Sequence, residues 1–358
     1  MISSLLFKEN SFEEIFINNI TINKLNLIFD AILCTKASLN FINEIDIKNL
    51  KKILSDCKKI KSLKSNLLFN LSFTINTNCR SSMVKLKNSH NYVFVNKLES
   101  FGQSLSIYGG HEFITLNIMR LLVQNNDVYA EIGANYGDFL FIINDEIGYL
   151  GSSYGFEASI TIFPYLKASV FVNKEENIKL ENLVISDVNG ILVFQITDSV
   201  GGYNSLSSAI KSDLILPYDY SSLYDVLNIE MQSVKLDNYF QNHNIAPNLV
   251  RLDIEGSECK VIRGLQYTIN QHKLYFLVEF QGALMAKFES EDSIINCFNM
   301  FYNSAYIIID IFSLQIINKE DLVYMYKELQ DTELLCIYSN EQFLQSFENI
   351  YTYEGVAL

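Results

Sequence analysis

Residues 128–137 read Val-Tyr-Ala-Glu-Ile-Gly-Ala-Asn-Tyr-Gly, and this stretch decides the fold expected for the chain. An apolar run ends at Glu131, two glycines follow at Gly133 and Gly137, and a second apolar run covers 139–143. This order predicts a buried parallel strand, a tight turn and a helix packed on the sheet, which together present a ligand at the carboxyl edge of a sheet. Gly133 has no Cβ to restrict the turn, and Gly137 allows helix and strand to approach closely.

The spacing of these glycines separates two classes of cofactor site. A dinucleotide-binding turn has the pattern G-x-G-x-x-G, whereas this turn has G-x-N-x-G with Glu131 two residues before the first glycine. S-adenosylmethionine carries an ammonium group and a sulfonium but no phosphate, so its site needs carboxylates where a nucleotide site needs free N–H groups. The pattern therefore favours S-adenosylmethionine over a dinucleotide. A purely structural turn is the alternative.

Length and charge exclude several other classes of protein. The 358 residues suffice for one large domain with an appendage or for two domains, and 49% hydrophobic residues can fill a substantial core. Lys and Arg number 27 against 41 Asp and Glu, so the formal net charge is −14 and a nucleic-acid partner is not expected. No apolar stretch approaches the ~18 residues of a transmembrane segment, and the first residues lack the apolar core of a signal peptide. We therefore expect a cytoplasmic protein whose six scattered cysteines are reduced thiols and form no zinc site.

The N-terminal part of the chain is expected to form a separate helical appendage. Helical spacing of apolar residues extends over 1–70, and residues 71–110 alternate more like strands and turns. Residues 48–64 form a basic amphipathic pattern with seven lysines and one acid. Such a helix usually presents a solvated face, and weak docking to an anionic membrane or an acidic protein is the alternative. We place the appendage at 1–95 and a Rossmann-like domain at 96–358.

Strand and helix patterns alternate after residue 137. Helices are expected over 113–123 and 164–172. Strands are expected to end at Glu157 and to cover 180–186, 191–196, 249–254, 274–280, 306–312 and 334–338. This rhythm predicts an α/β fold with a Rossmann-like, doubly wound, mostly parallel sheet.

Acidic residues stand where successive strands are expected to end: Glu131, Glu157, Asp187, Asp253 and Glu279. The carboxyl ends of parallel strands converge on one crevice, the usual ligand site of such a sheet. An acid after the second strand suits the two hydroxyls of a ribose, which are donors in need of an acceptor. Ser186 and Asp187 suit an adenine amine. A helix N-cap is the alternative role for each acid.

The chain resembles the FkbM-type methyltransferases, which use S-adenosylmethionine. The resemblance covers roughly 105–340 and rests on the matching stretches 131–137, 156–157, 186–187 with Gly190, 202–206, 234–237 and 251–258. It implies a fold of the class I methyltransferase type in which Glu131, Gly133, Asn135 and Gly137 hold the methionine end of the cofactor, Glu157 holds its ribose, and Ser186 and Asp187 hold its adenine. Ala134 and Phe156, which lie in the matching stretches, are also expected to bind the cofactor. The resemblance also implies that Asp253 faces the reacting methyl group.

The sequence departs from the family pattern at three positions. Glu131 stands where the family often has Asp, Ala158 follows Glu157 in place of Pro, and Arg251 replaces Lys. None of these changes removes a functional group that cofactor binding needs.

Methyl transfer to a hydroxyl needs alignment of the acceptor oxygen, exclusion of water and a nearby base. The candidate catalytic residues are Asp253, Glu255 and Glu279. An acidic first turn of a helix is the alternative role for Glu255. His111 and His243 are further candidate bases, although a solvated or core histidine is the more common case. Paired acids can also hold a divalent ion, but no metal-specific set of ligands is found in the sequence.

The expected function is that of an S-adenosylmethionine-dependent O-methyltransferase, and the family resemblance implies that the acceptor is a hydroxyl on a sugar, glycan or secondary metabolite. The alternative is a non-catalytic binding or regulatory protein on a methyltransferase fold, with the N-terminal helices as its partner surface. A nucleic-acid methyltransferase ranks last because the chain has the wrong charge and no N-P-P-Y type motif. The Ser- and Tyr-rich loop over 200–222, including Tyr203, is expected to form a lid over the acceptor.

Overall fold

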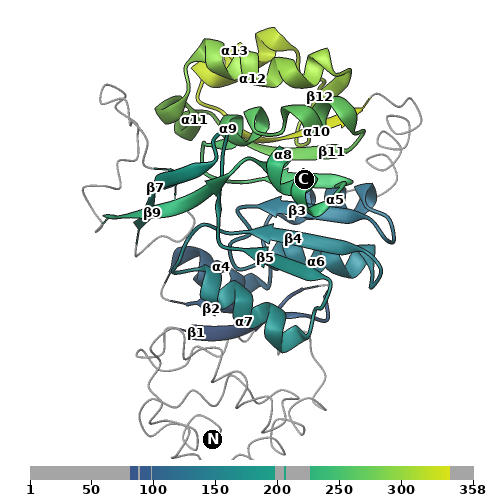
Figure 1. Cartoon of the computed structure of the whole chain (residues 1–358), viewed down its shortest axis with the longest axis vertical. Coiled ribbons are helices and arrows are strands. Elements are labelled where there is room, and N and C mark those ends of the chain that lie inside the picture. The colour runs from purple at the N-terminus through teal and green to yellow at the C-terminus, as the bar shows by residue number, and fades with distance from the viewer. Residues whose placement is uncertain (1–80, 88, 98, 198–204, 207–225, 339–358) are drawn as a thin grey trace, which may run out of the picture.

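The computed structural model describes residues 81–338 except 88, 98, 198–204 and 207–225 (Figure 1). Three sequence-based predictions fall wholly or mostly outside these residues: the N-terminal appendage up to residue 80, the basic helix over 48–64, and the acceptor lid over 200–222. Within the described residues, no helix is both long enough and apolar enough to cross a lipid bilayer.

The centre of the structure is a seven-stranded sheet in the order β12-β13-β11-β10-β3-β4-β5. Strands β3, β4, β5, β10 and β11 are parallel, whereas β13 runs antiparallel to both of its neighbours. The strands are β3 (Val128–Ile132), β4 (Ser152–Phe156), β5 (Ile178–Glu181), β10 (Leu249–Leu252), β11 (Tyr275–Gln281), β12 (Tyr306–Asp310) and β13 (Asp331–Tyr338). The predicted doubly wound, mostly parallel sheet is confirmed. Because the strand order reverses between β3 and β10, a ligand crevice is expected there.

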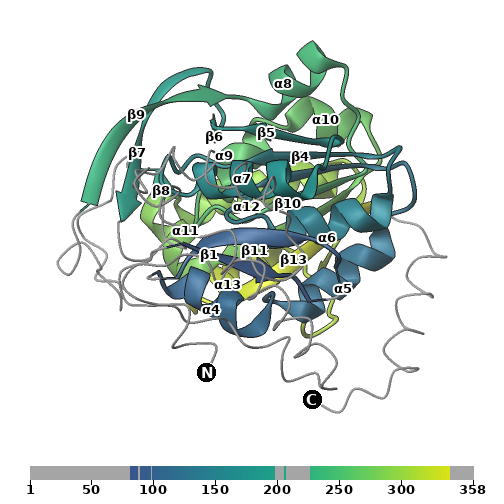
Figure 2. The same cartoon turned by 90° about the horizontal axis from the view of Figure 1, so that it is seen from below.

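Helices cover both faces of this sheet (Figures 1 and 2). Buried residues of α4 to α7 join one hydrophobic core, and those of α8 to α13 join the other. The alternation of strand side chains explains the division, since Tyr129 enters the first core and Ala130 the second. The helices are α4 (Ser100–Tyr108), α5 (Phe113–Leu122), α6 (Asp138–Ile147), α7 (Phe163–Asn173), α8 (Leu236–His243), α9 (Glu258–Arg263), α10 (Gln266–Gln271), α11 (Gly282–Phe288), α12 (Glu291–Asn303) and α13 (Lys319–Lys327).

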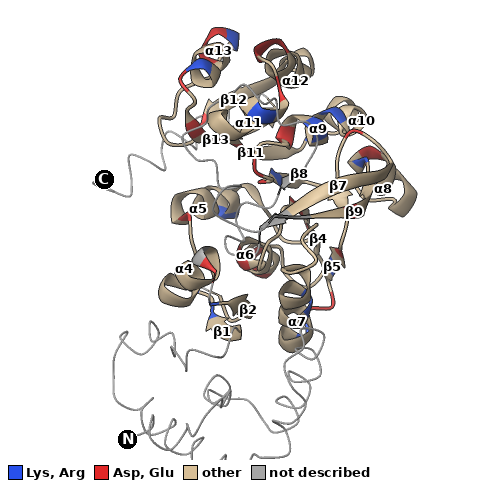
Figure 3. Cartoon of the chain, turned by 90° about the vertical axis from the view of Figure 1, so that its left-hand side faces the viewer, with Lys and Arg blue, Asp and Glu red and all other residues tan. Residues whose placement is uncertain are grey.

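A second, four-stranded sheet projects from the side of the molecule (Figures 1 and 3). Its order is β6-β9-β7-β8, with β6 (Val184–Ile185), β7 (Gly190–Thr197), β8 (Ser205–Leu206) and β9 (Val226–Val234). The single strand predicted over 180–186 is therefore wrong, because β5 ends at Glu181 and β6 belongs to the other sheet. Asn182 makes the turn between them by donating to the carbonyls of Glu157 (2.7 Å) and Ala158 (3.1 Å). The edge strand predicted over 191–196 is β7, which pairs with β9 and β8 and not with the main sheet.

A β-hairpin of β1 (Ser81–Lys85) and β2 (Tyr92–Asn96) packs against α7. The side chain of Asn173 accepts from Tyr92 N (2.9 Å) and donates to Tyr92 O (2.6 Å), while Ser169 Oγ accepts from Phe94 N (2.8 Å). These side chains satisfy the edge of β2 that β1 leaves unpaired. The domain boundary predicted at residue 95 lies inside β2, and the hairpin shares a hydrophobic core with α5 and α6.

Candidate functional site

A cavity of about 540 Å³ opens at the carboxyl edge of the main sheet, where β3 and β10 lie side by side. Nine of the predicted site residues line it: Glu131, Gly133, Ala134, Asn135, Phe156, Glu157, Asp253, Glu255 and Glu279. Gly137, Ser186 and Asp187 do not. The topology therefore brings most of the predicted set together at the switch point of the sheet.

The turn after β3 is shaped by two residues with positive φ, Gly133 (89°) and Asn135 (47°). The N–H groups of Gly133 and Ala134 both donate to Phe156 O at 2.9 Å, which fixes the turn to the end of β4. A Cβ on Gly133 would lie 1.8 Å from Asp253 O, so no other residue fits between the two strand ends.

Gly137 has a different role from the one the family resemblance implies. It has φ of 89° and precedes the first residue of α6. A Cβ there would lie 2.5 Å from Leu166 Cδ1 of α7. Gly137 therefore lets α6 and α7 pack closely and only indirectly supports the cavity.

Glu157 holds the turn from the other side. Its Oε2 accepts from Asn135 N at 2.8 Å and its Oε1 from Ser159 N at 2.7 Å. Burial raises the pKa of Glu157 to about 7, although these two N–H groups act to lower it. A carboxylate oxygen has more than one acceptor site, so both oxygens can still accept from a ligand in the cavity.

Arg251 is the charged centre of the cavity wall and is only 2% exposed. Its Nη2 lies 2.9 Å from Asp253 Oδ2 and 3.0 Å from Glu112 Oε2, and its guanidinium stacks 4.1 Å from the ring centroid of Phe139. Two further carboxylates surround it at longer distances, Glu131 at 3.5 Å and Glu333 at 3.7 Å. Four acidic side chains therefore share one buried guanidinium.

Strand register explains why these acids meet. Arg251 on β10 is the register partner of Glu131 on β3 and of Leu277 on β11. Glu279, two residues beyond Leu277, faces the same side of the sheet, and its antiparallel partner on β13 is Glu333. Like charges directly opposite each other on neighbouring strands are destabilising. This pair therefore depends on Arg251 or on bound protons.

The protonation states of these acids differ. Burial raises the pKa values of Glu131, Glu279 and Glu333 well above the usual range. Burial also acts to raise the pKa of Asp253, but the Arg251 guanidinium, a hydrogen bond with Glu279 and the nearby His111 together outweigh it, and the pKa of Asp253 is lowered. Asp253 is thus ionised at neutral pH, beside carboxyl groups that hold their protons more tightly.

Several buried oxygens at this site have no hydrogen-bond partner among the described residues. They are Glu131 Oε2, Asn135 Oδ1, Glu255 Oε2, Glu279 Oε2 and Gln281 Oε1. Each of the five can accept a hydrogen bond, and a buried acceptor without a donor is costly. An ammonium group and several hydroxyls would supply the missing donors, so these residues fit the amino-acid and ribose groups of S-adenosylmethionine.

The loop after β10 separates the roles of two neighbouring acids. Glu258 Oε1 accepts from the N–H groups of Ile254 (2.9 Å) and Gly256 (3.2 Å), so Glu258 fixes the loop. Glu255 has φ of 58° and lines the cavity. Since α9 begins at Glu258, Glu255 lies before the helix and not in its first turn.

Ser186 and Asp187 lie away from the cavity because the chain leaves the main sheet after β5. Asp187 Oδ2 instead accepts from Arg263 Nε at 2.9 Å, and Arg263 Nη2 lies 2.7 Å from Glu289 Oε1. The cavity wall next to Glu157 is formed by Leu183, Val184 and Ile185. These three apolar side chains therefore occupy the part of the cavity wall in which Ser186 and Asp187 were predicted to bind the adenine.

Sequence reasoning missed several residues of the wall. Arg251 was noted only as a departure from the family pattern, and Glu112 and Asp138 were not predicted. Glu333, which lies 3.7 Å from Arg251 but does not line the cavity, was not predicted either. A charged residue inside the apolar run 249–252 is the one available signal for Arg251.

Of the two candidate histidines, only His111 lines the cavity. Its Nδ1 lies 2.6 Å from Asp138 Oδ2. Burial acts to lower the pKa of His111, but the carboxylates of Asp138 and Glu112 outweigh it, and the pKa is raised. His243 lies on α8, with its Nδ1 2.8 Å from Tyr239 O.

In two groups among the described residues, the candidate ligand atoms lie close enough together to hold a metal ion. The first group is Glu112, Glu279 and Glu333, and the second is His90, Asp145 and Glu175. In the first group, Arg251 already lies close to Glu112 and Glu333. The second group lies outside the cavity.

Comparison with known proteins supports the class that the fold and cavity indicate. Residues 131–301 match the family model of the methyltransferase FkbM domain. The resemblance found in the sequence is thereby confirmed for these residues. A search of curated proteins returned no match.

Three solved structures illustrate the structural comparison. Methyltransferase FkbM from Methylobacillus flagellatus KT has 14% identity and a TM-score of 0.36, over 60% of this chain and 44% of that one. This chain thus covers less than half of that protein. TYW2 from M. jannaschii, solved in complex with AdoMet, has 9% identity and a TM-score of 0.35, over 74% and 87% of the two chains. A SAM-dependent O-methyltransferase from Thermotoga maritima has 8% identity and a TM-score of 0.34, over 73% and 78%.

Replacing Arg251 with methionine should destabilise the protein strongly at neutral pH. The substitution leaves buried carboxylates without a cation, and breaking such a pair costs about 3–5 kcal/mol in the free energy of unfolding. The acids then bind protons more tightly in the folded than in the unfolded state. The penalty should therefore be small at acidic pH and should grow as the pH rises through their raised pKa values.

Denaturant unfolding of Arg251→Met and wild type at about pH 5 and about pH 8 measures this difference. Arg120→Met is the matched control, because Arg120 Nε pairs with Glu146 at 2.6 Å in a partly exposed position, where an ion pair contributes at most about 1 kcal/mol. A penalty for Arg251→Met that equals the control, or that does not change with pH, would contradict the role given to Arg251.

Proposed function

We propose that the protein is an S-adenosylmethionine-dependent O-methyltransferase that acts on a hydroxyl of a sugar, glycan or secondary metabolite. The observation that carries the proposal is the set of unpartnered buried acceptors in a cavity at the switch point of the sheet. The FkbM domain supports methyl transfer in general. The choice of a hydroxyl acceptor rests on the chemistry of the cavity.

The cavity offers a distinct place for each part of the cofactor. The turn Gly133–Asn135 and Glu131 would hold the amino-acid end, and Glu157 would accept hydrogen bonds from the two ribose hydroxyls. The apolar wall of Leu183, Val184 and Ile185 replaces Ser186 and Asp187 as the surface against the purine ring. When bound, S-adenosylmethionine supplies a methyl group that its sulfonium has already activated.

Three carboxyl groups would face the acceptor: Asp253, Glu255 and Glu279. Asp253 is ionised and would complement positive charge near the reacting methyl group. Burial raises the pKa of Glu255, and the carboxylates of Asp253 and Glu258 raise it further, which makes its ionised form the stronger base. With its unpartnered Oε2, Glu255 in its ionised form would accept the proton that the hydroxyl loses.

Calorimetric titration with S-adenosylmethionine tests the cofactor assignment. Wild type should bind one equivalent, and Glu157→Ala should bind at least about tenfold more weakly because it loses charge-assisted hydrogen bonds. Glu176→Ala, an exposed glutamate outside the cavity, is the control and should match wild type. A folded wild-type protein that shows no heat of binding would contradict the proposed function.

The raised pKa of Glu157 predicts how cofactor affinity depends on pH. Ribose hydroxyls donate to the ionised carboxylate, and below about 7 the protonated form dominates. The dissociation constant of wild type should therefore rise as the pH falls below about 7, approaching tenfold per unit. Glu157→Gln cannot titrate and should show a weaker and flatter dependence when both proteins are titrated between about pH 6 and pH 8. Equal slopes for the two proteins would show that Glu157 does not bind the ribose.

A further inference from the structure

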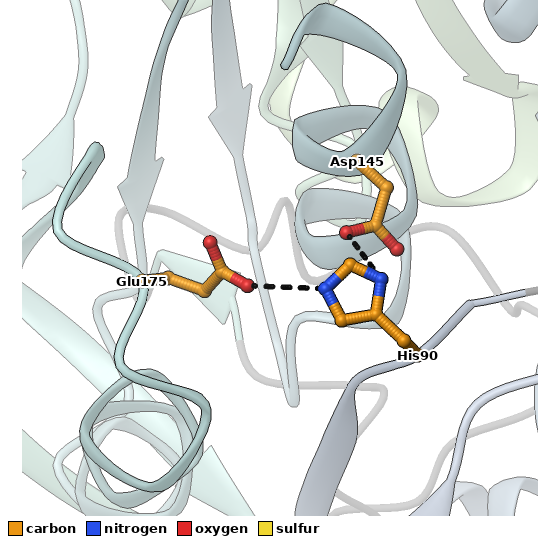
Figure 4. A group of neighbouring side chains, drawn as sticks. All are labelled: His90, Asp145 and Glu175. Carbon is orange, nitrogen blue, oxygen red and sulfur yellow. Dashed lines mark ion pairs between the residues drawn. The ribbon is translucent and has the colours of Figure 1, made fainter. Parts of the chain in front are cut away.

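Three side chains from distant parts of the sequence converge on the surface at His90, Asp145 and Glu175 (Figure 4). His90 lies in the turn between β1 and β2, Asp145 lies in the last turns of α6, and Glu175 follows α7. The His90 ring lies between the two carboxylates, with Nδ1 3.4 Å from Asp145 Oδ1 and Nε2 3.9 Å from Glu175 Oε1. None of the three lines the cavity described above.

Both carboxylates are held in place by neighbouring polar side chains. Asp145 accepts from Ser89 Oγ at 2.6 Å and from Asn91 Nδ2 at 2.9 Å. Glu175 Oε2 accepts from Asn144 Nδ2 at 3.1 Å, and Asn144 in turn accepts from Ser153 Oγ at 2.9 Å. Asn91 and Asn144 are buried, with 1% and 3% exposure. Hydrogen-bonded outer partners of this kind orient the ligands of metal sites.

The charges and exposures of the three residues favour a bound cation. The carboxylate side chains are only 16% exposed, whereas the His90 side chain is 77% exposed. A divalent ion between them would relieve the repulsion between the two acids and leave the third side open to water.

We propose that His90, Asp145 and Glu175 form a transition-metal site suited to Zn²⁺. One imidazole nitrogen with two carboxylate oxygens is a donor set for zinc, and water completes the coordination. The three candidate ligand atoms already lie within 4.8 Å of one another. Zn–N and Zn–O distances of about 2.0–2.2 Å place tetrahedral ligands roughly 3.3–3.6 Å apart. Rotation of the exposed imidazole and a small movement of the two carboxylates would close the remaining distance.

A metal at this position ties together three segments that secondary structure leaves separate. It connects the β1–β2 turn to the end of α6 and to the segment between α7 and β5. Because a preformed site does not exist in the unfolded chain, metal binding adds to folding stability. The site is independent of the proposed methyl transfer.

Zinc titration of the metal-stripped, full-length protein tests the proposal. Wild type should bind one Zn²⁺. His90→Ala lacks one of the three ligands and should bind Zn²⁺ at least about 100-fold more weakly. Glu175→Gln, which keeps the shape of the side chain, should also weaken binding. The melting temperature of wild type should rise with Zn²⁺ but not with Mg²⁺. His243→Ala removes a different exposed histidine and should behave like wild type.

Each outcome decides between the metal site and a simple ion pair. Zinc-dependent stabilisation that is present in wild type and His243→Ala but absent in His90→Ala and Glu175→Gln supports the site. If His90 only pairs with the two acids, His90→Ala lowers the melting temperature equally with and without zinc, and this result would overturn the proposal. Zinc binding of equal strength in wild type and His90→Ala, for example at a cysteine, would overturn it as well, and so would the absence of zinc binding by wild type.

Discussion

The candidate site depends above all on the interaction of one buried guanidinium with the acids around it. Arg251 is enclosed by Asp253, Glu112, Glu131 and Glu333, and it lies against the ring of Phe139. A charge can be buried at this depth only when it is paired, and the acids in turn could not gather without it. One consequence is a difference between the acids, because Arg251 acts to lower the pKa of Asp253 while burial raises the pKa values of Glu131 and Glu333 well above the usual range. Arg251 thereby stabilises the cavity wall, which still offers several hydrogen-bond acceptors to a ligand.

Sheet topology brings these residues together at the carboxyl edge of the main sheet, where the candidate site lies. The crevice forms where β3 and β10 are adjacent but their connections run to opposite faces, and Gly133 allows the loop after β10 to approach within reach of the β3 turn. Asn135 N and Ser159 N hold Glu157 at the rim of the same crevice. Cofactor and acceptor would therefore meet at an edge whose backbone is fixed by hydrogen bonds and packing, which favours alignment of the reacting atoms.

Much of this arrangement could be predicted from local sequence patterns. The strand-turn-helix pattern of 128–143 gave the first strand and its glycine turn, and acids at strand ends gave Glu157, Asp253 and Glu279. Ser186 and Asp187 were misplaced because an apolar run does not reveal that the chain leaves one sheet for another at Asn182. Arg251 and its partners could not be assembled either. Its contacts with Glu131 and Glu112 span 120 and 139 residues, and such pairings follow from strand order, which no local pattern encodes.

The central claim is that the acceptors around Arg251 and Glu157 form a site for S-adenosylmethionine. A crystal structure of the protein with S-adenosylhomocysteine tests it most directly, since that product lacks only the transferred methyl group. In this crystal structure both ribose hydroxyls should bind Glu157, and the amino group should lie near Glu131 and the Gly133–Asn135 turn. The sulfur should face Asp253 and Glu255. A ligand bound elsewhere, or bound in this cavity with its ribose away from Glu157, would contradict the account.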